Sequence, residues 1–172
     1  MLVKIIQRAK QLTKAKDSTI AIGGILDYFL SNEFTTIEQV DLTAYCQLDD
    51  TDILSAIKKW QHHRDPVISL LCNRLLNRKS FKCKMQDKPI SESEWDAAYA
   101  LVKAKFPMNE KDLSFLCFKG EATNTLYKND GETIKILLKT GQISTISQIQ
   151  NALINESLSA PVKKFYICLL NE

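Results

Sequence analysis

The chain has 172 residues, of which 45% are hydrophobic and 25% are charged, so its composition is that of an ordinary globular protein. This balance excludes collagen-like, low-complexity and strongly disordered chains. The formal net charge of +3 is too small to indicate a nucleic-acid-binding protein from the total alone. No run of 18 apolar residues occurs, so the sequence predicts no membrane-spanning helix.

The cysteines are scattered, and no two have the C-x-x-C spacing of a zinc knuckle or a redox motif. Each lies among apolar residues, which predicts small buried side chains in a reducing compartment. No signal peptide opens the chain, so we expect a cytoplasmic protein. The cysteines are Cys46, Cys72, Cys83, Cys117 and Cys168.

The first half of the chain shows helical periodicity. No capping residue precedes its first helix, which suggests that this helix began upstream in a longer protein. Further along, Asp49 or Asp50 is placed to cap one helix, and Asp65 followed by Pro66 is a typical helix start. The helices expected in this half cover residues 2–14, 23–32, 36–44, 49–60 and 65–78.

From residue 80 the pattern changes to a period of two. Phe81, Cys83 and Met85 alternate with Lys82 and Lys84, which predicts a half-buried strand. The following elements are a helix opened by an S-x-x-E capping box, an apolar central strand, a second strand, a short helix and a last strand. These six elements cover residues 80–85, 91–106, 113–119, 132–139, 147–155 and 165–170.

The order strand, helix, strand, strand, helix, strand is that of the ferredoxin-like βαββαβ pattern. It predicts an antiparallel sheet with helices on one face. The expected fold class is therefore α+β, with a helical segment over residues 1–79 and an α+β domain over 80–172.

Neither the histidines nor the clustered acidic residues indicate a metal site. Neighbouring residues of a helix point about 100° apart, so His62 and His63 do not easily share one ion, and a solvated helix end is favoured. Carboxylates can hold magnesium, but Asp49, Asp50 and Asp52 already serve to cap a helix. No phosphate-binding glycine loop or nucleophile elbow occurs, and the sequence shows no catalytic centre.

One segment, residues 74–88, is strongly basic, with six lysines and arginines against Asp87 alone and a local charge of +5. Arg78 leaves the end of a helix and Lys82 lies on the first strand, so the two could bind phosphates. Cations also complement a helix C-terminus, and lysines solvate the outer face of a strand. On these residues alone, the second interpretation is favoured.

Three stretches of the chain carry a resemblance to a known family. The run LDDTDILSAIKKW, the following D-P pair and LLNRKSFK resemble the C-terminal part of HD-domain phosphohydrolases, which include the deoxynucleoside triphosphate triphosphohydrolases. The stretches LSFLCFKGEATNTLY, IKILLKTGQISTIS and APVKKFYICLL are similar to the tail of bacterial members. The resemblance covers nearly the whole chain, and Arg78, Phe81 and Lys82 form its most specific part.

The resemblance implies a region without its catalytic core. The family's divalent-metal site uses a His-Asp doublet and further His and Asp ligands, but here His63 precedes Arg64 and no such doublet exists. We therefore expect a C-terminal regulatory and oligomerisation region, inactive alone and without cofactor, whose partners are an N-terminal HD core and further copies of the chain. By the matching R-x-x-F-K motif, Arg78 and Lys82 would contact the phosphates of an activating nucleoside triphosphate.

Two alternatives stay open at this point. A free-standing nucleic-acid-binding domain could use the basic segment together with aromatic residues of the sheet such as Phe115 and Phe118, although these lie on opposite faces of one strand. A scaffold domain would use Arg78 and Lys82 only for contacts within the chain.

Overall fold

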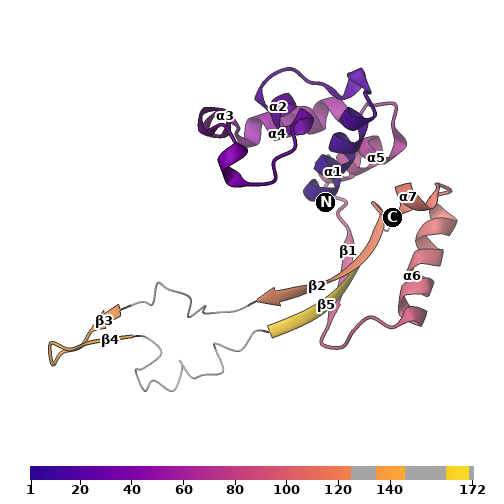
Figure 1. The fold of residues 1–172 in the computed structure, drawn as a ribbon. Helices are drawn as coiled ribbons and strands as arrows, with labels where there is room; N and C mark the ends of the chain where they lie inside the picture. Colours follow the sequence, from indigo (N-terminus) through magenta and orange to yellow (C-terminus); the bar gives the residue numbers. More distant parts are fainter. Residues whose placement is uncertain (125–134, 146–161, 171–172) are drawn as a thin grey trace. The chain divides into compact units, whose positions relative to one another are not determined.

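The computed structural model describes residues 1–124, 135–145 and 162–170, which form two compact units (Figure 1). The first unit comprises Met1–Lys82, Ala98–Phe118 and the chain from Cys168 onward. The second unit comprises Cys83–Ala97 and the described part of Lys119–Ile167. The expected domain boundary between residues 79 and 80 stays a prediction.

Helix α1, Leu2–Lys14, has the bounds that its periodicity predicts. Met1 stands at the N-cap and no side chain caps the first turn, as expected from the sequence. Ile5 and Ala9 are fully buried, whereas the basic residues of the helix lie on its more accessible faces. The apolar stripe of α1 thus belongs to the core of the first unit.

The other helices of the first unit are short. The single helix expected over 36–44 is wrong, because the chain forms a 3₁₀ turn there and then α3, in which the Asp41 carboxylate accepts from the N–H groups of Thr43 and Ala44. The elements are η1 Ser18–Ile20, α2 Ile25–Ser31, η2 Ile37–Gln39, α3 Leu42–Gln47, α4 Asp50–Trp60, α5 Pro66–Leu76 and α7 Glu110–Leu113.

Two of these helices begin where their capping residues predict. Asp49 and Asp52 form a reciprocal capping box at the start of α4. Asp65 caps α5 by accepting from the N–H of Ile68 at 3.0 Å, and Pro66 occupies the first position of that helix. Helix capping depends on residues three apart in sequence, which explains why these boundaries follow from the sequence.

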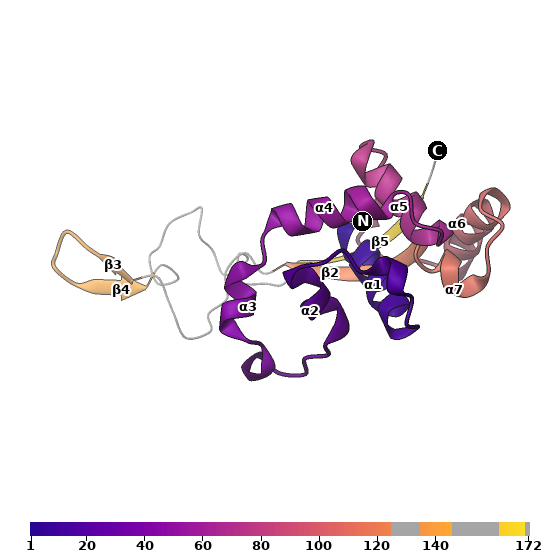
Figure 2. The ribbon, with the colours of Figure 1, turned by 90° about the horizontal axis from the view of Figure 1, so that it is seen from above.

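The helices α1, α2, α4 and α5 pack together into the core of the first unit (Figure 2). Helix α1 contacts α2 and α5, and α4 contacts the same two helices. Helical periodicity predicts Leu54, Leu70 and Leu75 on buried stripes, but Leu54 is 52% exposed, and Leu70 and Leu75 are half-buried. The largest fully buried side chains of this core are Trp60, Ile5, Ile57, Ile68, Leu71, Leu113, Leu116 and Leu170.

A three-stranded sheet follows, with the strand order β1-β5-β2. Strand β5 is central, so the expectation that the stretch 113–119 forms a central strand is wrong. Its first residue ends helix α7, which is capped by the Asn109 side chain, and the strand begins only at Cys117. The elements are β1 Lys82–Gln86, α6 Glu92–Lys105, β2 Cys117–Asn124 and β5 Val162–Leu169.

Strand β1 does not bury one face as its alternating pattern predicts. Cys83 and Met85 are exposed, and Phe81 is half-buried just before the strand begins. Strand β1 lies at the edge of the sheet, where only one neighbouring strand pairs with it. Helix α6 begins at the predicted capping box, in which Ser91 and Glu94 exchange hydrogen bonds.

Strands β3, Lys135–Leu137, and β4, Ile143–Thr145, form an antiparallel hairpin. Gly141 adopts a left-handed φ of 81° in the turn between them, a conformation that glycine takes without strain. The α+β class is confirmed, but the strand expected over 132–139 pairs with β4 and not with the three-stranded sheet. The sequence Asn129-Asp130-Gly131, which favours a turn, and the helix expected over 147–155 lie outside the described residues.

The five cysteines do not share one environment, although the sequence predicts that all are buried and reduced. Cys72, Cys117 and Cys168 are buried as expected, whereas Cys46 and Cys83 are exposed. Cys83 and Cys168 are disulfide-bonded, which corrects the expectation that all five are reduced thiols. None of the helices in the described ranges combines the length and the apolar composition that crossing a bilayer requires.

Candidate functional site

The end of helix α5 places Arg78 in an unusual backbone conformation. The Arg78 N–H donates to the carbonyl of Leu75 at 3.1 Å, and the Lys79 N–H donates to the carbonyl of Arg74 at 2.8 Å. These two bonds form a Schellman motif, in which Arg78 occupies the position that glycine usually takes. Accordingly its φ is +57°, in the left-handed region.

A left-handed conformation costs a residue with a Cβ about 1 kcal/mol relative to glycine. The Arg78 side chain is exposed, and in the described part of the chain it forms no ion pair that would offset this cost. Lys16 occupies the same position after α1, with a φ of +59° and the same pair of backbone bonds. The two helix ends are therefore matched, which makes Lys16 a natural control for Arg78.

Phe81 anchors the segment that follows Arg78 within the first unit. Its ring packs edge to face on Phe118, with the centroids 5.1 Å apart and an interplanar angle of 87°. The Lys4 ammonium lies 4.6 Å from the centroid of the same Phe118 ring. The aromatic residue of the R-x-x-F-K motif is thus an anchor within the fold, and the rings are occupied by each other and by a lysine.

Lys82, the first residue of β1, is exposed and forms no ion pair among the described residues. Four residues before Arg78, a buried nitrogen of Arg74, Nη1, has no hydrogen-bond partner in that part of the chain. Buried donors are almost always satisfied, so such an atom marks a place where an acceptor is missing. The basic segment therefore contains cationic donors that lack an acceptor or a carboxylate partner among the described residues, on Arg74, Arg78 and Lys82.

One cation of the basic segment, Lys84, is neutralised within the fold, and the segment's only acid, Asp87, is paired with a lysine from outside it. In the second unit, the Lys84 ammonium donates to the Glu94 carboxylate at 2.9 Å, and Lys164 pairs with Asp87. The hydrogen bond from Lys84, together with those from Ser91 and Gln86, lowers the pKa of Glu94 to about 2. The predicted charge of +5 therefore overstates the number of cations that are free to bind a ligand.

Arg8 is a structural cation that the sequence did not single out. Its guanidinium donates to both carboxylate oxygens of Asp65, at 3.1 and 2.7 Å, and its Nη1 lies 2.9 Å from a carboxylate oxygen of Asp112. Burial raises the pKa of the Asp65 carboxyl, but the hydrogen bonds from Arg8 and from the Ile68 N–H outweigh it, and the pKa is lowered. Asp65 is thereby both a helix cap and an ion-pair partner.

The two histidines have different environments. His62 is exposed, as expected for a solvated helix end. The side chain of His63 is only 4% exposed; its Nδ1 accepts from the Asp65 N–H at 3.0 Å, and its Nε2 lies 2.7 Å from the Thr19 hydroxyl. Since Nδ1 is an acceptor, Nε2 carries the proton of the neutral ring, and His63 cannot take a proton from Thr19. The contact is structural.

The acidic residues at the start of α4 act as caps, in agreement with the interpretation favoured by the sequence. Within the described ranges, no group of three or more His, Cys, Asp or Glu side chains is placed to hold a metal ion.

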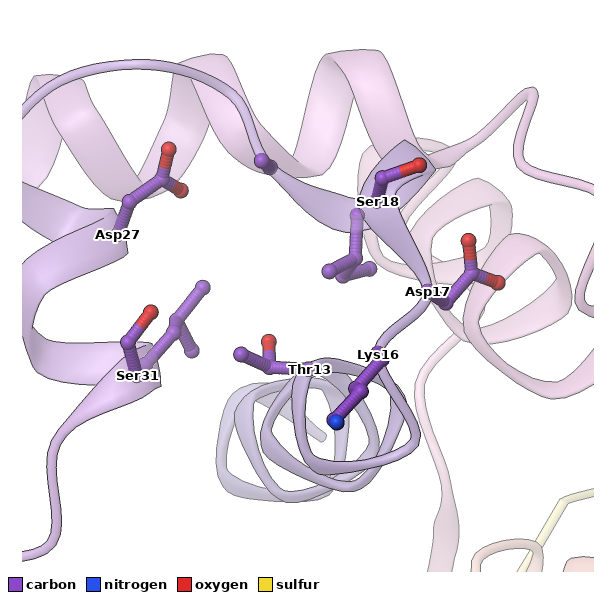
Figure 3. A pocket seen from close by; sticks show the side chains of 9 residues that line it. Thr13, Lys16, Asp17, Ser18, Asp27 and Ser31 are labelled. Carbon is purple, nitrogen blue, oxygen red and sulfur yellow. The ribbon is translucent and has the colours of Figure 1, made fainter.

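A small pocket lies at the end of α1, with a volume of about 190 Å³. Figure 3 shows Asp27 and Ser31 on one side and Thr13, Lys16 and Asp17 on the other. The carboxylate oxygens of Asp27 accept from the N–H groups of residues 22 and 23, and a hydrogen bond from the Thr19 side chain lowers the pKa of Asp17 to about 2. The carboxylates thus serve the fold, and their charge disfavours an anion here.

Comparison with solved structures identifies the class of protein to which this arrangement is related. The chain is similar to a phosphohydrolase from Bacteroides thetaiotaomicron VPI-5482, with a TM-score of 0.81 and 28% identity over 99% of this chain and 43% of that one. The fold and the sequence together support a phosphohydrolase-related region. No family model matches the chain.

A protein of Bacillus subtilis (strain 168) is similar as well. It is YwfO, named as an uncharacterized protein, and it is 28% identical over 167 residues. The match covers 92% of this chain and 36% of YwfO. The chain therefore spans less than half the length of either relative.

Proposed function

We propose that the chain is the C-terminal regulatory and oligomerisation region of an HD-type, metal-dependent nucleotide phosphohydrolase, and that it is not catalytic by itself. In this proposal Arg78 and Lys82 contact the phosphates of a nucleoside triphosphate that regulates the parent enzyme. The catalytic metal and the HD core belong to the part of the parent that this chain lacks, and the parent acts in the cytoplasm.

The observation that carries the proposal is the conformation of Arg78 within the basic segment 74–88, since Lys16 shares the conformation but not the segment. The fold holds an arginine where glycine would be favoured, and the guanidinium is exposed without an anionic partner among the described residues. Strained residues of this kind gather at functional sites, and a guanidinium is well suited to bidentate contact with phosphate. The likeness to a phosphohydrolase supports the same class of ligand.

The alternative of a nucleic-acid-binding sheet has less support. Single-stranded nucleic acids bind to proteins by stacking bases on exposed aromatic rings. Here Phe81 and Phe118 pack on each other, and Phe115 is only 4% exposed. Neither arrangement offers an open ring to a base.

The test compares Arg78→Gly with Lys16→Gly by thermal shift and calorimetry, with GTP, dGTP and dATP as ligands. Both substitutions place glycine at a left-handed position, so each is expected to raise the melting temperature by about 2–4 °C, which corresponds to about 1 kcal/mol. Arg78→Gly should lower the stabilisation by nucleotide more than Arg78→Lys, which keeps the charge but loses the bidentate contact, and Lys16→Gly should leave it unchanged. Equal nucleotide stabilisation in all three variants would refute the contact.

Two further measurements test the rest of the proposal. Incubation with deoxynucleoside triphosphates and manganese should release neither phosphate nor triphosphate, and turnover above a blank would show an active enzyme. Light scattering of the chain should detect oligomers that nucleotide strengthens; a monomer at all concentrations, with and without nucleotide, would contradict the oligomerisation role.

A further inference from the structure

A second set of cations lies on helix α1, away from the R-x-x-F-K motif in sequence. They line a shallow concavity of about 390 Å³, whose walls all belong to the first unit. Four of the lining residues recur every three or four positions along α1 and so share one helix face. The lining residues are Lys4, Gln7, Lys10, Gln11, Lys14, Ser114 and Phe115.

Lys4 is held at one end of the concavity by two aromatic rings. Its Nζ lies 4.6 Å from the centroid of Phe118 and 5.6 Å from that of Phe115, and it has no carboxylate partner among the described residues. Burial lowers the pKa of Lys4, because the charged ammonium is partly removed from water without a counter-ion. An anion bound at this end would supply the missing charge.

The rest of the concavity is poor in negative charge. Glu33 pairs with Lys14, and both side chains are more than 60% exposed, so this pair is worth little and can exchange for another anion. Lys10 is half-buried and has no ion pair in the described part of the chain; its charge also acts on Glu33. One carboxylate, Glu33, therefore serves two ammonium groups, Lys10 and Lys14, and Lys4 has none.

The neutral side chains add donors. The side-chain oxygen of Gln11 accepts from Arg8 Nη1 at 3.2 Å, and because a guanidinium can only donate, this fixes which end of the Gln11 amide is the oxygen. The Gln11 NH₂ group is then left to donate to a ligand. Gln7 is exposed on the same helix face and offers another amide.

These groups fit an anion with several charges in a row. Lys4 and Lys14 are ten residues apart on a helix that rises 1.5 Å per residue, so the donors extend over about 15 Å. Phe115 is only 4% exposed and is covered by the cations of Lys4 and Arg8, so the concavity offers no open ring for a base and little apolar surface for a peptide.

We propose that this concavity binds a linear oligophosphate through Lys4, Lys10 and Lys14, and that it recognises the phosphate chain and not the nucleoside. The site uses other side chains than the contact proposed for Arg78 and Lys82. Its ligand is either inorganic polyphosphate or the phosphate tail of a nucleotide, because the two share this chemistry.

The experiment is calorimetry of the chain with sodium tripolyphosphate at low and at moderate salt. The double variant Lys10→Gln/Lys14→Gln should weaken binding at least tenfold, because two of the three ammonium groups are lost, and Lys4→Gln should weaken it further. The matched control is Lys58→Gln/Lys103→Gln, which removes the same charge from exposed positions on α4 and α6 and should change the affinity by less than threefold.

Further ligands and variants separate the outcomes. ATP and dGTP should bind within about threefold of tripolyphosphate, and adenosine should not bind. The proposal is overturned by a lack of tripolyphosphate binding at low salt, by an equal effect of the control variant, by a tenfold preference for one nucleoside, or by tighter binding of a single-stranded oligonucleotide. It is also overturned if Arg78→Gly abolishes tripolyphosphate binding while the Lys10/Lys14 variant retains it, since the ligand then binds at the other site.

Discussion

Replacement of Arg8 by methionine should destabilise the first unit more than any other single change to its polar contacts. Arg8 connects α1 with the cap of α5 and with α7, through a two-fold contact to Asp65 and a second contact to Asp112. Methionine keeps an unbranched side chain and the helix propensity of the position but removes the guanidinium. Two carboxylates are then left without their cation.

The size of the effect follows from burial. The side chains of Arg8, Asp65 and Asp112 are 14%, 11% and 15% exposed, so the network is mostly but not fully removed from water. Breaking a fully buried pair costs about 3–5 kcal/mol, and the lower end of this range is appropriate here. A loss of about 3 kcal/mol corresponds to a fall in melting temperature of about 6–12 °C.

Two conservative variants separate the contributions. Asp65→Asn keeps a side-chain oxygen that can cap α5, so it measures the ion pair without the cap. Asp112→Asn leaves the Arg8–Asp65 contact in place and should cost only about 1 kcal/mol. The order of unfolding free energies in urea, followed by circular dichroism, should be native, then Asp112→Asn, then Arg8→Met.

The pH dependence provides a second check. The Asp65 pKa is lowered in the folded state, so the stabilisation by its charge is complete above its unfolded pKa of about 4 and is lost as the pH falls through the folded value. The difference between native chain and Arg8→Met should therefore shrink between pH 5 and pH 3. An Arg8→Met variant within about 0.5 kcal/mol of the native chain at pH 7, or an unchanged difference at pH 3, would refute this reasoning.

Three other substitutions or modifications test the fold. Gly120→Ala should destabilise the second unit by about 1–3 kcal/mol in urea unfolding, because an added Cβ would lie 2.6 Å from the Tyr166 hydroxyl, and Tyr166→Phe should recover part of the loss. Trp60→Phe should cost about 2–3 kcal/mol, since it removes ring volume and a buried indole N–H donated at 2.8 Å to a backbone carbonyl of η1. At pH 8 a thiol reagent should label the exposed Cys46 in the native state but should label Cys72 only in urea, because burial raises the Cys72 pKa to about 12. Mass spectrometry detects the labelled residues, and rapid labelling of Cys72 in the native state would contradict its buried position.

Sequence patterns of short range predicted the local structure well. The bounds of α1 and the caps at Asp49, Asp65 and Ser91 follow from residues within one helical turn of each other. The conformation of Arg78 could not be predicted, because the usual signal for a left-handed helix end is a glycine, and none is present there.

The candidate sites were only partly visible in the sequence. Arg78 and Lys82 stood out through their motif and their local charge. Lys4 carries no such signal, since the rings that hold it come from Phe115 and Phe118, more than a hundred residues away. The partner carboxylates of Arg8, on Asp65 and Asp112, also lie far along the chain, the nearer one 57 residues away.

The amino-acid order by itself determined the helical first half, the starts of α1, α4, α5 and α6, and the α+β class, because hydrophobic period and capping act between near neighbours. Tertiary structure alone decided that β5 lies between β1 and β2, that β3 pairs with β4, and which cations are neutralised. Strand pairing and ion pairs join residues distant along the chain, and several arrangements satisfy the same alternation of polar and apolar residues. Only the packed molecule selects one of them.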